Sequence, residues 1–146
     1  MNQNGATLIL VAEDDDDHFL LTREAMEAAQ LHCRMDRVRD GVELMDYLQR
    51  TGKYADLSGN PLPTLILLDL NMPKKDGREV MVEIKEQSPF NRIPLLAFST
   101  SLDQEDVERG YDLGLNSFFR KPTHFSEWVD MMKLIKSYWL ETAVLP

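Results

Sequence analysis

Residues 64–77, TLILLDLNMPKKDG, determine how the rest of this 146-residue chain is organised. Four apolar residues, 65–68, run directly into Asp69, and Asn71 and Gly77 follow in a polar segment. An apolar run of this length that ends in turn-forming residues is typical of a buried parallel strand. Asp69 is therefore expected at the carboxyl end of a strand, the edge where open α/β sheets bind ligands. Taken alone, its carboxylate fits a binding site and a turn cap equally well.

Length and composition indicate a single globular domain covering residues 1–146. The chain is 43% apolar and 28% charged, which is usual for a soluble protein. No apolar run reaches the roughly 20 residues of a membrane span, and residues 1–7 lack the regions of a signal peptide, so we expect a cytoplasmic protein without membrane contact. The net charge of −9 argues against unaided nucleic-acid binding and suits divalent cations or basic partner surfaces. The single cysteine, Cys33, excludes an intramolecular disulfide.

A second predicted strand also ends in carboxylates. Residues 8–12 form a short apolar run, which is followed by five consecutive acids, Glu13 to Asp17, and then by apolar residues at helical spacing. An aspartate at a helix start can cap free N–H groups, but one would be enough. Because five adjacent acids repel one another, a bound cation is as good an interpretation as capping. His18 has no second histidine at ligand spacing and is interpreted as a helix-surface residue.

The rest of the chain alternates strands with helices. A loose alternation over residues 33–38 indicates an edge strand, a further apolar run ends at Ser99, and a short strand at 116–119 leads into Lys121. Residues 51–63 form a loop rich in Gly and Pro that fits either recognition or a solvated spacer. The pattern predicts an α/β fold with a doubly wound parallel sheet, five βα units and right-handed crossovers.

Four strand ends meet at one edge of this predicted sheet and bring together Glu13, Asp14, Asp69, Ser99 and Lys121. Phosphoryl transfer to a carboxylate needs a nucleophilic oxygen, a divalent cation and a positive charge beside the transferred group. Asp69 is the candidate nucleophile. Asp14 and Asp69, with Glu13 acting through water, offer an oxygen-rich site suited to Mg²⁺. The cation and Lys121 would hold the phosphoryl oxygens, and the Ser99 hydroxyl would donate one hydrogen bond to them.

In these residues the chain resembles the receiver domain of two-component response regulators over essentially its whole length. The resemblance is carried by the acidic pair at 13–14, the motif LLDLNMPKKDG around Asp69, the hydroxyl of Ser99 and the pair Lys121-Pro122. Ser99 and Lys121 follow Asp69 by 30 and 52 residues, a spacing that fits the family. Each motif alone is weak, and their joint order and spacing identify the family.

The resemblance implies a three-layer, flavodoxin-like fold with strand order 2-1-3-4-5. It also implies that Asp69 is the phosphoacceptor and becomes an aspartyl phosphate. Glu13, Asp14 and Asp69, with the main-chain carbonyl of Asn71, correspond to the Mg²⁺ site of the family. Lys121 corresponds to the phosphate-binding lysine, and a cis peptide bond to the proline that follows it is expected.

Ser99 corresponds to the switch hydroxyl of the family, and Phe118, three residues before the lysine, to its aromatic switch. Phe118 has no hydroxyl where many members have tyrosine, so apolar burial alone should favour its inward position. Thr100 stands where Ala or Gly is common in the family, and its bulk is expected to slow dephosphorylation.

The end of the chain, residues 138–146, and the enlarged loop at 51–63 are most similar to single-domain response regulators of bacterial phytochromes, chiefly those of cyanobacteria. This resemblance implies a phosphoprotein that receives its phosphoryl group from a phytochrome-type sensor histidine kinase. It would then signal through a changed protein-binding surface. Its phosphotransfer would be stoichiometric, so the protein is not expected to be an enzyme in the turnover sense.

The last predicted helix, which runs to Tyr138, carries more apolar residues than one buried face needs. One stripe is expected to face the core: Phe125, Trp128, Val129, Met132 and Ile135. A second stripe and the tail at 139–146 are predicted to form the contact of a homodimer: Met131, Leu134, Tyr138, Trp139 and Leu140. The alternative is that the tail folds back over its own domain.

A haloacid-dehalogenase-type phosphohydrolase is the alternative from another functional class, since it also uses a strand-end aspartate and Mg²⁺. That superfamily places a second acid two positions after the nucleophile, where this chain has Asn71, and it carries a cap domain for which the sequence leaves no room. A receiver that acts only as a phosphorylation-independent scaffold is a third possibility. The intact Asp69, Ser99 and Lys121 argue against it.

Overall fold

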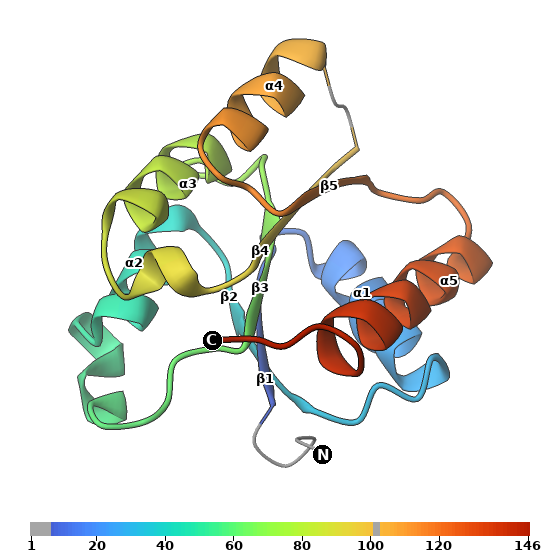
Figure 1. Cartoon of the computed structure of the whole chain (residues 1–146), viewed down its shortest axis with the longest axis horizontal. Helices are drawn as coiled ribbons and strands as arrows, with labels where there is room; N and C mark the ends of the chain where they lie inside the picture. Colours follow the sequence, from blue (N-terminus) through green and yellow to red (C-terminus); the bar gives the residue numbers. More distant parts are fainter. Residues whose placement is uncertain (1–6, 101–102) are drawn as a thin grey trace.

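The strands of the chain form one parallel sheet. A computed structural model describes residues 7–100 and 103–146, and its five strands pair in the order β2-β1-β3-β4-β5 (Figure 1). The strands are β1 (Leu8–Ala12), β2 (Arg34–Val38), β3 (Leu65–Asp69), β4 (Leu95–Ser99) and β5 (Ser117–Arg120). The predicted fold class and strand order are confirmed. Most of the N-terminal segment that was assessed for a signal peptide, residues 1–6, lies outside the described residues.

Helices cover both faces of the sheet. α1 and α5 lie on one face and α2 and α3 on the other, with α4 next to α3 at the β5 end of the sheet (Figure 1). The helices are α1 (Asp16–Ala28), α2 (Gly41–Gln49), α3 (Gly77–Glu86), α4 (Gln104–Asp112) and α5 (Phe125–Ile135), with shorter turns at η1 (Gly52–Leu57), η2 (Phe90–Arg92) and η3 (Lys136–Leu140). Over the residues that the structure describes, no helix has the length and apolar character needed to cross a membrane.

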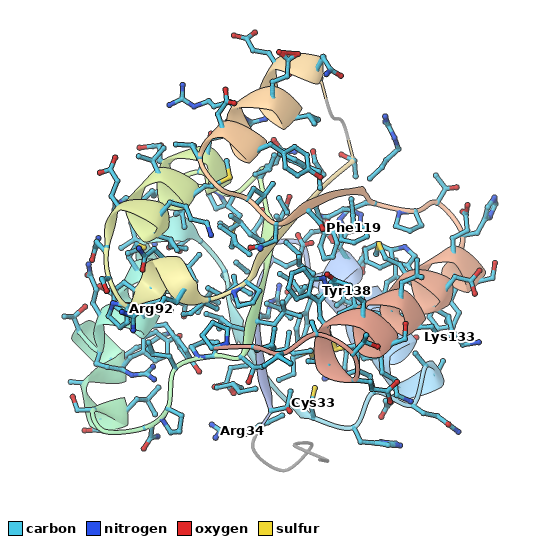
Figure 2. The ribbon with its side chains drawn as sticks, in the orientation of Figure 1. Cys33, Arg34, Arg92, Phe119, Lys133 and Tyr138 are labelled. Carbon is cyan, nitrogen blue, oxygen red and sulfur yellow. The ribbon has the colours of Figure 1, made fainter. Side chains whose placement is uncertain are left out.

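Alternate residues of the buried strands enter two separate cores. In β1, Ile9 and Val11 belong to the core under α1 and α5, whereas Leu10 and Ala12 belong to the core under α2 and α3. Successive strand residues point to opposite faces, so a sheet covered on both faces requires a continuous apolar run. Figure 2 shows side chains filling the space between the sheet and the helices on both sides. Each buried strand is therefore apolar along the length that contacts the two cores.

The strand register brings the ends of β3, β4 and β5 to one edge of the sheet. Asp69 is aligned with Phe98 of β4, and the Lys121 N–H donates a hydrogen bond of 2.9 Å to the Ser99 carbonyl. The chain after β3 also returns closely to this edge. A Cβ atom on Gly77 would lie 2.7 Å from the Asp69 carbonyl oxygen, so a larger residue would push the loop away from the strand.

The enlarged loop at 51–63 is a folded segment held against α2, which argues against a solvated spacer. The Arg50 guanidinium donates to the Pro61 carbonyl at 2.9 Å, and the Tyr54 hydroxyl donates to Glu43 Oε2 at 2.6 Å. These bonds hold η1 on the far side of the sheet from α5 (Figure 1).

The packing of α5 differs from the prediction at two positions. Phe125, which was expected in the core, is 42% exposed, whereas Met131, which was expected at a dimer contact, is buried in the core under α1 and α5. α5 packs against α1 as well as against the sheet, so its buried surface is wider than the single predicted stripe. The predictions for Phe125 and Met131 were therefore wrong.

Beyond α5 the chain turns back under the sheet. Trp139 and Leu140 pack half-buried against the core under α1 and α5, and the last residues line a pocket with Thr7 and Thr64 at the amino ends of β1 and β3. The tail then crosses to the side of α2 and α3 (Figure 1). The tail thus covers its own domain, at the sheet edge opposite to Asp69.

Candidate functional site

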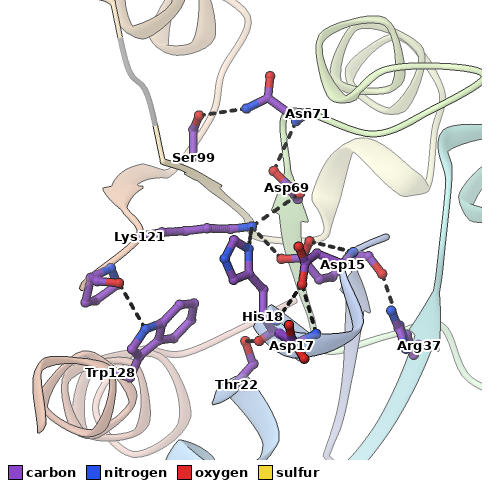
Figure 3. Close-up of polar contacts among 12 residues, drawn as sticks. Asp15, Asp17, His18, Thr22, Arg37, Asp69, Asn71, Ser99, Lys121 and Trp128 are labelled. Atoms are coloured by element: carbon purple, nitrogen blue, oxygen red, sulfur yellow. Dashed lines mark hydrogen bonds and ion pairs between the residues drawn. The ribbon is translucent and has the colours of Figure 1, made fainter. Parts of the chain in front are cut away.

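Asp69 lies at the centre of the carboxyl edge of the sheet and is only 5% exposed (Figure 3). Its Oδ1 accepts a hydrogen bond of 3.0 Å from the backbone N–H of Asn71, and its Oδ2 lies 3.3 Å from the Nζ of Lys121. One carboxylate oxygen is thus fixed by the loop that follows β3, and the other faces a buried ammonium group.

Lys121 reaches this position from the end of β5. Its Nζ donates a hydrogen bond of 2.6 Å to Glu13 Oε1, so it forms ion pairs with two carboxylates from two other strand ends. Burial raises the pKa of Glu13 to about 8, because a charge is poorly solvated there and Asp69 lies beside it, while Lys121 acts in the opposite direction. Burial and Asp69 thus oppose the charged form of Glu13, and Lys121 offsets part of that effect.

Three carboxylates at this edge form a candidate metal centre. Glu13, Asp14 and Asp69 each offer one oxygen, and the three oxygens lie within 4.8 Å of one another. Glu13 and Asp69 are buried and Asp14 is exposed, so the cluster is open to solvent on one side. Oxygen-only ligands of this number suit a hard divalent cation that keeps some of its water. The chemistry of the donor set therefore fits the cation that the sequence predicted.

The five consecutive acids have different structural surroundings. Glu13 and Asp14 belong to the candidate metal centre, and the residues after them contact α1 or the end of β2. Asp15 is the N-cap of α1, and its carboxylate accepts from the N–H groups of Asp17 and His18. Asp16 pairs with Arg37 and Arg39 from the end of β2. The backbone bond from His18 lowers the pKa of Asp15, and the Arg39 guanidinium lowers that of Asp16. The capping interpretation is thus confirmed for Asp15, and the cation interpretation stays a prediction for Glu13 and Asp14.

A second polar contact joins the β3 loop to the end of β4. Asn71 Nδ2 donates a hydrogen bond of 3.1 Å to Ser99 Oγ, and the Ser99 side chain is fully buried (Figure 3). The sequence suggested a role for the Asn71 main-chain carbonyl but gave no signal for this side-chain amide. The role of the Asn71 main-chain carbonyl as a ligand of the cation stays a prediction.

Phe118 lies in β5, half-buried against the core under α2 and α3. Its ring packs on Gly110 of α4, where a Cβ atom would lie 2.3 Å from the ring, and meets the Tyr111 ring in a T-shaped contact. The Phe118 N–H also donates to the Tyr111 hydroxyl at 3.4 Å. The ring at the expected switch position is therefore in direct contact with α4.

Two predictions about this edge were wrong. His18 is not a helix-surface residue: it is half-buried, and its Nδ1 lies 3.0 Å from Lys121 Nζ. The bond between Lys121 and Pro122 is not cis, since the cis peptide bond of the described residues lies at Ser88–Pro89. In the observed trans form, which X-Pro bonds generally prefer, the Pro122 carbonyl accepts from the Trp128 indole at 3.1 Å.

Comparison with known proteins agrees with this geometry. The sequence profile of the response regulator receiver domain matches residues 9–133. The chain belongs to the response regulator receiver family. Response regulator Rcp1 of Synechocystis is 38% identical to this receiver, over 98% of the chain and 95% of Rcp1.

Solved structures give the same relationship for this receiver. The phosphorylated cyanobacterial phytochrome response regulator RcpA is 41% identical and superposes with a TM-score of 0.87, over 96% of this chain and 98% of RcpA. A Mn²⁺-bound form of Rcp1 is 38% identical and superposes with a TM-score of 0.86, over 96% of this chain and 99% of that one. The receiver is therefore related to phytochrome response regulators, and these comparisons give no support for a haloacid-dehalogenase-type phosphohydrolase.

The acidic cluster predicts that a divalent cation stabilises the fold. At about 100 times its dissociation constant, a ligand that binds only the folded state adds about 2.7 kcal/mol, which corresponds to a rise in Tm of several degrees for a chain of this size. We expect Mg²⁺ or Mn²⁺ to raise the Tm of the wild type in this way. The Tm of Asp14→Asn should not change when either cation is added. Differential scanning calorimetry measures both.

The control is Asp17→Asn, which removes one charge from the same acidic run outside the cluster. It should keep the full rise in Tm. An equal rise in Asp14→Asn would contradict the assignment of Asp14 to the metal centre.

Proposed function

We propose that Asp69 is the phosphoacceptor of this response regulator. Its support is the buried carboxylate that has Lys121 on one oxygen and two further carboxylates within reach of a shared cation. A carboxylate oxygen of Asp69 attacks the phosphorus atom of a phosphohistidine, and the O–P bond forms as the N–P bond breaks. The product is an aspartyl phosphate.

The other residues of the edge stabilise the transferred group. Glu13, Asp14 and Asp69, with the main-chain carbonyl of Asn71, would hold Mg²⁺, which supplies charge compensation for the phosphoryl oxygens when it is bound. The Lys121 ammonium is already 3.3 Å from an Asp69 oxygen and supplies a second positive charge. The buried Ser99 hydroxyl would donate one hydrogen bond to the phosphoryl group.

This chemistry is self-catalysed phosphotransfer on one carboxylate, so the protein is a switch and not a turnover enzyme. The dehalogenase alternative would need an acid where this chain has Asn71. The alternative of a phosphorylation-independent scaffold leaves unexplained why two buried charges face Asp69, since buried charges without a function are costly to keep.

The direct test is phosphorylation with a small donor. Incubation with acetyl phosphate and Mg²⁺ should add one phosphoryl group to the intact wild type, as seen by mass spectrometry, and none to Asp69→Asn. The matched control is Asp36→Asn, at another aspartate that lies on β2 away from the metal cluster, and it should be labelled like the wild type. Equal labelling of Asp69→Asn would show that another group accepts the phosphoryl group.

The signal is proposed to pass from Ser99 to Phe118 and so to α4. Phosphorylation would draw the Ser99 hydroxyl towards the phosphoryl group and away from Asn71, and the Phe118 ring, which packs on Gly110 and Tyr111, would move with it. The changed surface over α4 and β5 is then the one that a downstream protein reads. A bulky Thr100 beside this hydroxyl is proposed to slow dephosphorylation.

Ser99→Ala separates phosphate acceptance from signalling. The variant should still accept phosphate, because Lys121 and the cation supply most of the charge compensation, but should lose most of the conformational response. NMR with beryllofluoride, a phosphoryl mimic, measures the response at Phe118. Chemical-shift changes of equal size in wild type and Ser99→Ala would argue against the relay.

The phosphoryl donor is proposed to be a phytochrome-type histidine kinase in the cytoplasm. The support is the similarity of this chain to RcpA, a cyanobacterial phytochrome response regulator, and to response regulator Rcp1. No direct contact with nucleic acid or a membrane is part of this proposal. A phosphorylated kinase of this type should transfer its group to the protein faster than an unrelated histidine kinase does, and equal rates would contradict the pairing.

The protein is also proposed to form a homodimer through α5. Leu134 and Tyr138 are 64% and 57% exposed and follow each other by one helical turn. Tyr138, which is labelled in Figure 2, lies in η3, directly after α5. Trp139 and Leu140 pack against their own domain, so only their exposed parts are available to a partner. This proposal therefore rests on two large exposed apolar side chains one turn apart, because contiguous exposed apolar surface often marks an interface.

Sedimentation velocity at micromolar concentration should give about twice the chain mass for the wild type. Leu134→Lys should shift the protein towards monomer, because a buried ammonium would oppose association. Val42→Lys changes an exposed apolar residue on α2, across the sheet, and should leave the dimer intact. A wild type that is monomeric with and without beryllofluoride would overturn the proposal.

A further inference from the structure

The side chain of His18 is built into the surroundings of Lys121. His18 is the third residue of α1, and its Nδ1 lies 3.0 Å from Lys121 Nζ although the two residues are 103 positions apart. Figure 3 shows its ring between the lysine and the indole of Trp128. No role for this histidine follows from the acidic cluster or from the phosphoacceptor.

The ammonium of Lys121 has three polar neighbours. Its Nζ lies 2.6 Å from Glu13 Oε1 and 3.0 Å from His18 Nδ1, both at hydrogen-bond distance, and forms an ion pair of 3.3 Å with Asp69 Oδ2. Glu13 follows β1, His18 lies in α1 and Asp69 ends β3. The lysine is 6% exposed, so water has little access to replace an acceptor that is lost. Because an ammonium group can only donate, His18 acts as the acceptor and carries its ring hydrogen on Nε2.

The backbone and the ring of His18 each contact a different neighbour. The His18 backbone N–H donates to the N-cap carboxylate of Asp15 at 3.0 Å, which fixes the start of α1. On the other side the ring lies against Trp128, with centroids 6.4 Å apart and a tilt of 41°. The Trp128 indole in turn donates to the carbonyl of Pro122, the residue that follows the lysine. The ring position is therefore tied to the backbone at both α1 and the lysine loop.

We propose that His18 is a positioning residue for phosphoryl transfer, which fixes the Lys121 ammonium between Glu13 and Asp69. The proposal rests on the proposed function of Asp69. The lysine stem has four flexible carbons, and Glu13 is the closer of its two carboxylates. Without the third acceptor the ammonium would shift towards Glu13 and away from the oxygen to which the phosphoryl group is transferred.

Two substitutions distinguish the effect of the acceptor nitrogen of His18 from the effect of its aromatic ring. His18→Phe keeps an aromatic ring against Trp128 but has no acceptor, whereas His18→Asn loses the ring and places a carbonyl oxygen close to the position of Nδ1. We expect phosphorylation by acetyl phosphate to be roughly tenfold slower in His18→Phe, the effect of about 1.4 kcal/mol on the transition state. His18→Asn should restore the rate to within about threefold of the wild type, as expected where an oxygen replaces the ring nitrogen as acceptor.

The control is His32→Asn, at an exposed histidine beyond the end of α1. It should be labelled like the wild type. Binding of Mg²⁺ and the Tm, measured on the same samples, should be alike in all variants, because a general structural defect would change them together with the rate.

A second readout does not depend on phosphorylation. Nitrogen-15 NMR of the unphosphorylated wild type should show His18 with an unprotonated Nδ1 and a Lys121 ammonium signal in slow exchange with water. The lysine signal should persist in His18→Asn and vanish in His18→Phe. If the wild type were not phosphorylated, the proposed function of Asp69 would fail while this signal still reported on His18.

Three outcomes would overturn the positioning role. The first is a folded His18→Phe that is labelled as fast as the wild type. The second is a His18→Asn as slow as His18→Phe, since the ring and not its acceptor would then matter. The third is a Lys121 signal that is the same in His18→Phe and the wild type.

Discussion

The buried ammonium of Lys121 is the interaction on which the rest of the structure depends. It lies between Glu13 and Asp69, and all three side chains are almost completely removed from water. Removal of either partner of a buried pair costs about 3–5 kcal/mol, because the remaining charge is left unpaired. That is a large part of the stability of a small domain. The ends of β1, β3 and β5 must therefore stay together for the protein to remain stable, and this same arrangement brings the reacting groups together.

The fold meets two opposing requirements at this edge. The apolar strands place the carboxylates in a rigid and poorly hydrated setting, where a nearby positive charge has the most effect. The loops after the strands then supply polar contacts, such as that of the Asn71 amide with the Ser99 hydroxyl, which is proposed to change partner on phosphorylation. Under this proposal the rigid part serves the chemistry and the exchangeable contact serves signalling. The Trp128 indole of α5 donates to the carbonyl of Pro122 in the lysine loop, and Tyr111 of α4 contacts the Phe118 ring of β5, so each of these helices contacts β5 or the loop that follows it.

The fold and most of the site were predictable from sequence because apolar runs that stop at a polar residue mark strand ends. Glu13, Asp14, Asp69, Ser99 and Lys121 all follow such runs, and they do meet at one edge. His18 gave no such signal, because a lone histidine is informative only when its partner is known and here the partner is far away in the sequence. The errors at Phe125 and Met131 have another cause: helical periodicity gives the spacing of a buried face but not its width, and α5 is covered by α1 as well as by the sheet.

Chemical trapping of the phosphorylated residue tests the role of Asp69 as phosphoacceptor most directly. Borohydride reduces an acyl phosphate to an alcohol, so an aspartyl phosphate becomes homoserine, which survives digestion and can be located by tandem mass spectrometry. After phosphotransfer from a histidine kinase and reduction, we expect homoserine at position 69 and aspartate at positions 14 to 17. Reduction at any of those other aspartates, or no homoserine in a protein that carries phosphate, would contradict the role assigned to Asp69.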